Sequence, residues 1–149
     1  MSIISPQTIQ LNATAATKEE AIRMAGDLLV KAGHVASTYV DGMLAREQTM
    51  STYIGNGVAI PHGQFDDKAS IHSTGISVVQ FLDGVDWEED ETAYLVIGIA
   101  ATADEHVGVL TNLAEVIEEP EDAEKLIRAT DPMEIINRLS RPQEETELA

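Results

Sequence analysis

The chain has 149 residues, enough for one domain with a substantial core but short for two. Asp and Glu number 26 against 9 Lys and Arg, so the formal net charge is −17, and binding to nucleic acid or anionic lipid is not expected. The sequence has no cysteine, which excludes disulfides and thiolate chemistry. It also lacks a signal-peptide pattern and any apolar run near the ~18 residues that span a membrane, so we expect a cytoplasmic protein without membrane insertion.

The N-terminal part of the chain predicts a short strand and a helix. Residues 8–12 suit a strand. Thr17 and Glu20 fit a capping box, in which two side chains satisfy N–H groups at the start of a helix. Apolar residues follow at helical spacing up to Gly33, a residue that favours the backbone conformation that ends a helix.

A second helix and a turn precede the first histidine of interest. The helix is expected over residues 37–47, with Arg46 in its last turn. Residues 55–57 (Gly-Asn-Gly) predict a turn that leads into a short apolar strand at 58–60. His62 follows this strand after a single proline.

Two longer apolar runs, at 75–81 and 93–101, have the length of strands that are covered on both faces. The acidic segment between them, residues 83–91, is expected to form an exposed loop with a short edge strand near Val85. These two runs are the strongest strand predictions in the chain.

The C-terminal part predicts helices. Residues 102–105 (Thr-Ala-Asp-Glu) fit a second capping box at the start of a helix. Further helices are expected at 121–129 and 131–139, the last with Asp131 as its N-cap and proline in its first position. We predict one domain over residues 1–140 and a disordered tail at 141–149.

Alternating strands and helices predict an α/β fold with a mixed, largely parallel sheet of about five strands, flanked by helices on both faces. Ligand sites in α/β sheets lie at the carboxyl ends of strands. His62 and His106 both follow an apolar strand, so we expect them at the same rim of the sheet.

His62 stands where a strand should end, because Pro61 biases the preceding residue toward extended geometry and has no N–H. Gly63 leaves room beside the ring and could bring its own N–H to a bound anion. From the residues alone, both an exposed reactive histidine and an ordinary loop histidine stay open.

His106 and Arg46 are the other candidates for anion chemistry. His106 falls in the first turn of its helix, where partial positive charge and unpaired N–H groups suit a phosphate. The guanidinium of Arg46 would suit a transferring phosphoryl group. The alternatives are a hydrogen-bonded histidine at a helix start and a cation that stabilises a helix C-terminus.

The remaining histidines, His34 and His72, lack supporting residues and are expected to be structural or at the surface. A metal site built from His62, His72 and His106 is conceivable, but no close-set histidine pair anchors it, so no metal or other cofactor is predicted. A hydrolase is disfavoured because the sequence has no nucleophile-elbow motif.

Three stretches together resemble one family: "ATKEEAIRMAG", "MLAREQTMSTYIGNGVAIPHG" and "VIGIAATADEHVGVLTNLAEVI". They resemble the mannitol/fructose class of enzyme IIA of the bacterial phosphoenolpyruvate-dependent sugar phosphotransferase system. The likeness covers about residues 8–140, and "DEHVGVLTNL" points within the class to the mannitol subfamily.

This resemblance implies that His62 accepts a phosphoryl group from the phosphocarrier protein HPr and passes it to enzyme IIB. His106 would be the family's second histidine, which hydrogen-bonds the phosphoryl group, and Arg46 the arginine near it. A mixed sheet flanked by helices is also implied. Because the chain ends soon after the domain, we expect a free-standing enzyme IIA rather than one fused to its membrane transporter.

Three alternatives remain. The protein could serve fructose rather than mannitol, or it could be a regulatory enzyme IIA of the nitrogen-related kind, although that branch generally lacks the second histidine. A non-catalytic binding module on the same fold is the alternative of a different class, in which His62 would be dispensable.

Overall fold

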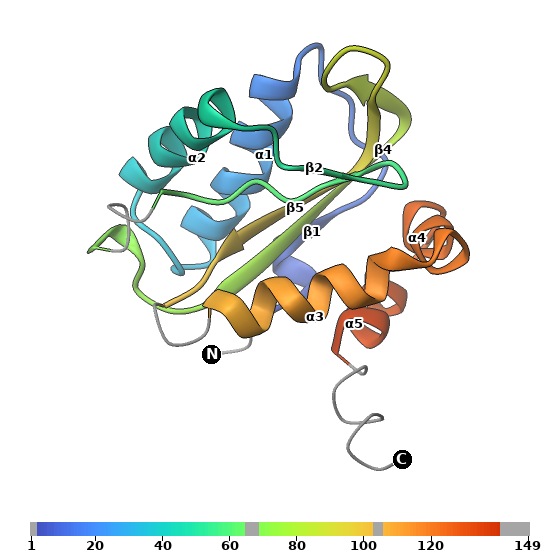
Figure 1. Ribbon diagram of the computed structural model, residues 1–149. Coiled ribbons are helices and arrows are strands. Elements are labelled where there is room, and N and C mark those ends of the chain that lie inside the picture. The colour runs from blue at the N-terminus through green and yellow to red at the C-terminus, as the bar shows by residue number, and fades with distance from the viewer. Residues whose placement is uncertain (1–2, 65–68, 103–105, 141–149) are drawn as a thin grey trace.

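The computed structural model describes residues 3–64, 69–102 and 106–140, which form one sheet with helices on both of its faces (Figure 1). The helices are η1 (Pro6–Thr8), α1 (Lys18–Lys31), α2 (Thr38–Thr49), α3 (His106–Glu118), α4 (Pro120–Ile127) and α5 (Pro132–Ser140). The strands are β1 (Ile9–Gln10), β2 (Tyr53–Gly55), β3 (Val58–Ala59), β4 (Gly75–Asp86) and β5 (Thr92–Ala100). The predicted capping box at 102–105, after its first residue, and the predicted disordered tail at 141–149 lie outside the described residues.

The strands of the described sheet lie in the order β1-β4-β5-β3-β2. β1 pairs with β4 and β3 with β5 in parallel, whereas β4–β5 and β2–β3 are antiparallel. The predicted mixed α/β sheet is confirmed. Parallel pairing is less extensive than expected, because β4 and β5, the longest strands, follow each other directly in the chain and pair as a hairpin.

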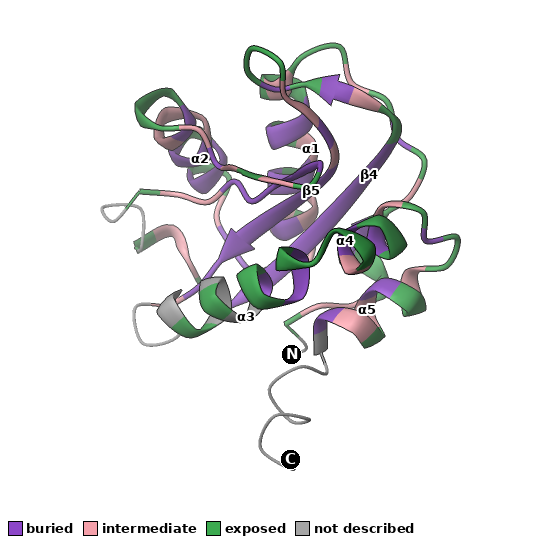
Figure 2. Cartoon of the chain, turned by 45° about the vertical axis from the view of Figure 1, so that its right-hand side comes forward, coloured by how far each residue is buried: buried purple, intermediate pink, exposed green. Residues whose placement is uncertain are grey.

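The central strands β4 and β5 are buried on both faces, as their continuous apolar sequences predict (Figure 2). Val96 belongs to one core cluster together with Ile22 of α1. The next residue, Ile97, belongs to a second cluster together with Leu113 of α3 and Leu126 of α4. Because neighbouring side chains of a strand point to opposite faces, each central strand contributes to both cores.

The start of α1 is capped by the predicted hydroxyl. The backbone N–H of Glu20 donates to Thr17 Oγ1 at 3.2 Å. The Glu20 carboxylate reaches back to the N–H of Ala16 at 3.4 Å, one residue before the position that a capping box requires. Gly33 follows the helix with a φ of 83°, a left-handed backbone that glycine adopts without steric cost.

The later helices also begin and end close to the predicted positions. α2 extends two residues beyond its predicted end, to Thr49. Asp131 Oδ1 accepts the backbone N–H of Met133 at 2.9 Å, as expected for an N-cap before α5. Among the helices of the described residues, none is long and apolar enough to cross a membrane.

The strand predicted near Val85 in the acidic segment 83–91 is confirmed, and most of the segment is exposed as expected, but Trp87 is not. β4 extends into it, and Val85 is a buried residue of that strand. Trp87 is buried with 3% of its surface exposed, and its indole N–H donates to Glu47 Oε2 at 3.1 Å. The acidic composition concealed this burial, because the acceptor lies 40 residues away in the sequence.

Glu47 is a buried carboxylate at the end of α2 that accepts several hydrogen bonds. Besides Trp87, its donors are the backbone N–H of Thr52 at 3.1 Å and the Thr52 hydroxyl at 2.6 Å. Lys18 Nζ lies 3.6 Å from Glu47 Oε2 and 2.8 Å from Glu88 Oε1. Partial burial lowers the pKa of Lys18, but the hydrogen bond to Glu88 and the charge of Glu47 outweigh it, so the pKa is raised.

We predict that Glu47→Ala lowers the free energy of unfolding by about 3–5 kcal/mol, the cost of removing one partner from a buried, hydrogen-bonded charge. The substitution leaves the indole N–H of Trp87 and the N–H of Thr52 without their acceptor. Urea denaturation followed by tryptophan fluorescence measures this loss, since Trp87 is the one tryptophan in the sequence.

The matched control is Glu124→Ala, which removes an exposed carboxylate paired with Arg128 at 2.8 Å. An exposed pair within one helix stabilises by less than about 1 kcal/mol, so this variant should unfold close to the wild type. Equal losses in the two variants would contradict a special role for Glu47.

Candidate functional site

β2 and β3 form a hairpin that carries the chain to His62. Its turn is Asn56–Gly57, with φ angles of 54° and 79°, as in the common two-residue hairpin loops. The predicted turn and the strand after it are confirmed, whereas β2 was not predicted because its three residues show no clear apolar pattern. Beyond β3, His62 pairs in parallel with Ile99 near the end of β5.

The tip of this hairpin is tied to the end of α3. The side-chain amide of Asn56 donates to the carbonyl of Ile117 at 2.9 Å and to that of Glu118 at 3.3 Å. These carbonyls belong to the last turn of α3, where helix carbonyls have no partner within the helix. The hairpin and α3 are therefore joined at the end of the sheet remote from His62.

The His62 ring is half-buried, and a backbone carbonyl fixes its orientation. Nδ1 lies 2.8 Å from the carbonyl oxygen of Ile60. Since a carbonyl only accepts, Nδ1 carries the proton and donates it to this bond. The neutral ring then has its lone pair on Nε2, so Nε2 is the nucleophilic nitrogen.

The backbone on both sides of His62 is tied to Ile99. Before His62, the Ile99 N–H donates to the carbonyl of Pro61 at 3.0 Å. After it, the N–H of Gly63 donates to the hydroxyl of Tyr39 at 2.8 Å, and this hydroxyl donates to the Ile99 carbonyl at 2.7 Å. The expectation that the Gly63 N–H meets an anion is therefore wrong for this structure, because that N–H has a protein acceptor.

Tyr39 is a buried residue of α2 that the sequence analysis did not single out. It lies four residues before Met43, which is also buried, on the inner face of the helix. Its position on the inner face of the helix could have revealed it, because a buried tyrosine needs a hydrogen-bond partner for its hydroxyl. The identity of that partner depends on the fold and could not be read from the helix.

Arg46 lies in the last turn of α2, as predicted, and its Nη1 donates to the Met50 carbonyl at 2.7 Å. This contact stabilises the helix C-terminus, which is the alternative role considered from the sequence. No hydrogen bond or ion pair joins Arg46 to His62 among the described residues. A role of Arg46 in holding a phosphoryl group stays a prediction.

His106 is the first residue of α3, and its side chain lies outside the described part of the structure. The backbone places it shortly after the end of β5, which is the strand that pairs with His62 (Figure 1). The two histidines therefore follow neighbouring strands at their carboxyl ends. Contact of the His106 side chain with the site stays a prediction.

The other two histidines match their expected roles. His34 is 1% exposed, and its Nδ1 lies 2.9 Å from Ser73 Oγ. A Cβ placed at Gly75 would come within 2.3 Å of the His34 ring, so this packing requires glycine. His72 is exposed. Within the described residues, no three His, Cys, Asp or Glu side chains lie close enough to hold a metal ion.

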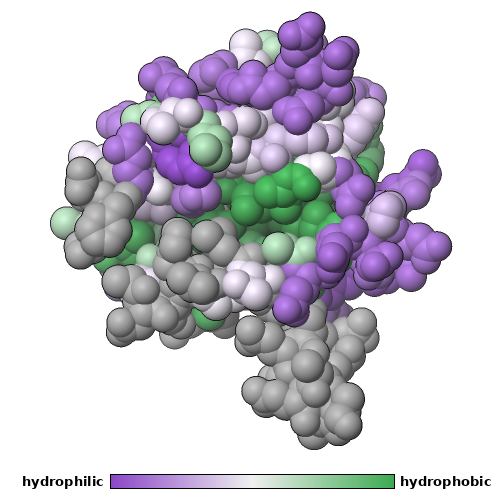
Figure 3. Space-filling view, viewed as in Figure 1, coloured by the Kyte–Doolittle hydropathy of each residue, from purple (hydrophilic) through white to green (hydrophobic). Residues whose placement is uncertain are grey.

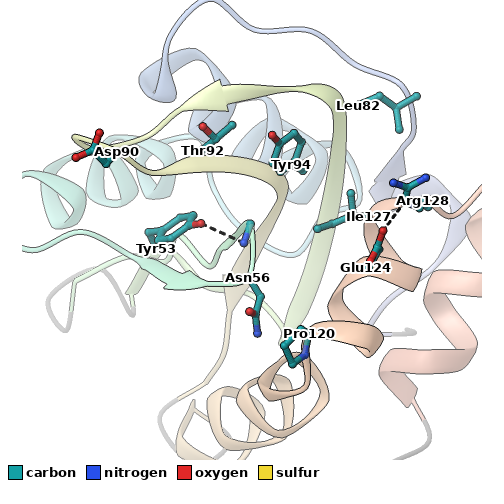
Figure 4. A pocket seen from close by; sticks show the side chains of 11 residues that line it. Tyr53, Asn56, Leu82, Asp90, Thr92, Tyr94, Pro120, Glu124, Ile127 and Arg128 are labelled. Atoms are coloured by element: carbon teal, nitrogen blue, oxygen red, sulfur yellow. Dashed lines mark hydrogen bonds and ion pairs between the residues drawn. The ribbon is translucent and has the colours of Figure 1, made fainter.

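A hollow of about 690 Å³ lies between the β2–β3 hairpin, the β4–β5 hairpin and α4 (Figure 4). It is lined by Tyr53, Asn56, Gly57, Leu82, Asp90, Thr92, Tyr94, Pro120, Glu124, Ile127 and Arg128. Tyr94 precedes Ile99 by five residues on β5, about 16 Å along a strand. This hollow is therefore separate from the histidine at the strand end.

Apolar surface is exposed on the face of the molecule shown in Figure 1. Figure 3 shows an apolar band between the β2–β3 hairpin and α3, with hydrophilic surface above it and on one side. Ile54 of β2 and Met50 at the end of α2 are among the exposed large apolar residues. Apolar surface within a polar rim is typical of protein-binding surfaces.

Comparison with known families assigns the chain to one of them. Residues 2–141 match the family model described as the phosphoenolpyruvate-dependent sugar phosphotransferase system, EIIA 2. The chain belongs to this family. This membership confirms the resemblance recognised in the sequence.

Relatives within the family are similar over most of the chain. A multiphosphoryl transfer protein of Salmonella typhimurium is 49% identical over 89% of this chain, which spans only 35% of that protein. The mannitol-specific enzyme IIA component of Geobacillus stearothermophilus is 42% identical over 94% of this chain and 97% of its own length. Among solved structures, the complex of Escherichia coli mannitol enzyme IIA with phosphorylated mannitol enzyme IIB matches with a TM-score of 0.87 at 41% identity, covering 93% of this chain and 97% of that chain.

We predict that His34 makes stability pH-dependent. Burial lowers its pKa below the usual 6.5, because desolvation disfavours the charged ring. The free energy of unfolding that the neutral His34 ring contributes is complete above pH 6.5. It is lost as the pH falls below 6.5, by up to about 1.4 kcal/mol per pH unit. Urea denaturation between pH 5 and 8 should therefore show a weaker pH dependence for His34→Gln than for the wild type.

The control for this experiment is His72→Gln, which removes an exposed histidine. It should keep the wild-type pH dependence. If His34→Gln also kept it, the buried ring would not be the group whose titration is measured.

Proposed function

We propose that this protein is a cytoplasmic phosphoryl carrier of a sugar phosphotransferase system. It accepts a phosphoryl group from phospho-HPr on His62 Nε2 and passes it to enzyme IIB for the uptake of mannitol. The observation that carries the proposal is the hydrogen bond from His62 Nδ1 to the Ile60 carbonyl at 2.8 Å, which leaves the lone pair on Nε2. Family membership and mannitol-specific relatives at 40–42% identity support it.

The transfer is an exchange of one P–N bond for another. The Nε2 lone pair of His62 attacks the phosphorus carried by the HPr histidine, and the old bond breaks with its electron pair remaining on the HPr ring. Phosphorylation withdraws electrons from the His62 ring and makes its Nδ1–H a stronger donor. The Ile60 carbonyl accepts this bond, so the phosphorylated ring is stabilised where it forms. In the second transfer, a nucleophile of enzyme IIB attacks the same phosphorus, and the bond from phosphorus to Nε2 breaks with its electron pair returning to the His62 ring.

Positioning and charge stabilisation supply most of the catalysis in phosphoryl transfer. We assign charge stabilisation to Arg46 and His106. Arg46 uses Nη1 for the Met50 carbonyl, and a guanidinium has five N–H donors, so others remain to meet phosphoryl oxygens. His106 begins α3, and the positive end of a helix favours a phosphoryl group nearby.

The surface suits protein partners. The net charge of −17 would attract an HPr with basic residues around its histidine and speed their encounter. Exposed Met50 and Ile54 offer apolar contact area. The matching Escherichia coli structure is a complex of mannitol enzyme IIA with phosphorylated enzyme IIB, which supports the second partner.

The sugar is proposed from relatives, because enzyme IIA passes its phosphoryl group to a protein and does not itself bind the sugar. Mannitol appears in the names of relatives that this chain matches over nearly their full length. The multiphosphoryl transfer proteins of Haemophilus influenzae and Salmonella typhimurium are 47% and 49% identical, and their names give no sugar. Fructose is therefore included in the test below.

The central test is intact-protein mass spectrometry after incubation with phosphoenolpyruvate, enzyme I and HPr. The wild type should gain one acid-labile phosphoryl group, and His62→Ala should gain none because its nucleophile is gone. His72→Ala, which removes an exposed histidine, should be phosphorylated like the wild type. Phosphorylation of His62→Ala would refute the acceptor assignment, and no phosphorylation of the wild type would favour a binding module.

The same phosphorylated protein then tests the sugar. It is mixed with mannitol-specific or fructose-specific enzyme IIB, and loss of its phosphoryl group is followed over time. Faster transfer to the mannitol-specific partner is expected. Faster transfer to the fructose-specific partner would reassign the sugar and leave the carrier role intact.

We further predict that Arg46→Ala and His106→Ala remain phosphorylated at His62 but accept the group about 100-fold more slowly, the usual cost of losing one stabilising donor. Quenched-flow measurement of acceptance from phospho-HPr gives these rates. Arg128→Ala, which changes an exposed residue directly after α4, is the control and should react normally. A wild-type rate for either site variant would return that residue to a purely structural role.

A further inference from the structure

We infer that Tyr39 is a positioning residue for the phosphoryl acceptor, because its hydroxyl takes the place of a backbone hydrogen bond in the sheet directly after His62. The inference rests on the proposed function of His62. It adds a second residue of α2, besides Arg46, to the proposed site.

The hydrogen bonds around His62 depart from a regular parallel ladder at one position. In a parallel pair, a residue of one strand bonds through its N–H and its C=O to the two neighbours of the residue opposite. Ile99 makes the first of these bonds normally, from its N–H to the Pro61 carbonyl at 3.0 Å. Its carbonyl does not receive the Gly63 N–H directly in the described structure.

The Tyr39 hydroxyl fills this position instead. It accepts the Gly63 N–H at 2.8 Å and donates to the Ile99 carbonyl at 2.7 Å. One direct bond of about 2.9 Å is thus replaced by two bonds in series. Gly63 is held away from β5, and the sheet ends immediately after His62.

Tyr39 can hold this geometry because it belongs to a closely packed helix. Tyr39 is 3% exposed. Val40, the next residue of α2, lies so near α1 that a Cβ at Gly26 would come within 2.8 Å of its Cγ2. A hydroxyl attached to such an element has little freedom to move, so it fixes the position of Gly63.

The bonds made by Pro61 and Gly63 fix the backbone of His62 between them. The Pro61 carbonyl is bound to the Ile99 N–H, and the Gly63 N–H is bound through Tyr39 to the Ile99 carbonyl. The backbone of His62 is therefore fixed from both sides against one residue. This sets the direction of the ring whose Nδ1 bonds to Ile60 and whose Nε2 must face the partner.

The test is Tyr39→Phe, which removes a single oxygen atom from a buried position. Gly63 can then close directly onto Ile99 and turn the His62 ring. We expect the kcat for acceptance from phospho-HPr to fall about 10- to 100-fold, as for a small misplacement of a reacting group. The KM for HPr should stay near the wild-type value, because Tyr39 is buried and does not form part of the docking surface.

A second measurement reports on the ring itself. Nitrogen-15 NMR of the unphosphorylated protein distinguishes the two neutral tautomers of histidine. The wild type should show His62 protonated at Nδ1, as its bond to Ile60 requires. Tyr39→Phe should show a mixture of tautomers, which general loosening of a distant region would not produce.

Tyr53→Phe is the matched control. The Tyr53 hydroxyl also accepts a glycine N–H, that of Gly57 at 3.1 Å, but at the turn of the hairpin remote from His62 (Figure 4). The same atom is removed from the same kind of bond, and the rate and the tautomer of His62 should not change. Equal effects of Tyr53→Phe and Tyr39→Phe would overturn the inference.

The outcomes separate this inference from the proposed function. If the wild type accepts no phosphoryl group, the proposed function fails, and the tautomer measurement still decides the role of Tyr39. If the wild type is active and Tyr39→Phe keeps both the wild-type rate and the wild-type tautomer, the positioning role fails and the carrier function stands.

Discussion

The buried carboxylate of Glu47 is the interaction on which the arrangement of this protein depends. It receives Lys18 from the start of α1, Thr52 from the segment before the hairpin and Trp87 from the β4–β5 connection. A buried charge without partners is unfavourable by several kcal/mol, which is comparable with the whole stability of a small domain. The fold is therefore stable only when these three segments meet at Glu47. The hairpin that carries His62 begins at one of them, which makes its starting position part of the same network.

The other end of the hairpin is held by the sheet. His62 lies one residue beyond Pro61, where β3 has just ended, and its backbone is aligned against Ile99 of β5. β5 is buried on both faces and supported by both layers of helices, so it is a rigid reference. A side chain that must be approached by other proteins has to stand at the surface, and a strand end on a rigid sheet is exposed without being mobile.

The sequence predicted those features whose cause is local or periodic. Thr17 caps a helix through a group three residues away, and the Gly-Asn-Gly turn depends only on its own backbone preferences. Burial of Trp87 and the hydroxyl of Tyr39 were missed because their partners lie 40 and 60 residues away, and only the fold brings them together. The sequence placed His62 at the end of a strand, where the structure has it, but it did not reveal the acceptor of the Gly63 N–H, for the same reason.

The bond between Asn56 and the last turn of α3 has a mechanical consequence. His62 is at one end of the hairpin and Asn56 at its tip, while His106 is at one end of α3 and the carbonyls bound by Asn56 are at the other. The hairpin and α3 are thus joined by hydrogen bonds at the end away from the two histidines. These hydrogen bonds restrain movement of the hairpin relative to α3. The position of the hairpin relative to α3 is thus set by a contact inside the protein, whichever partner is bound.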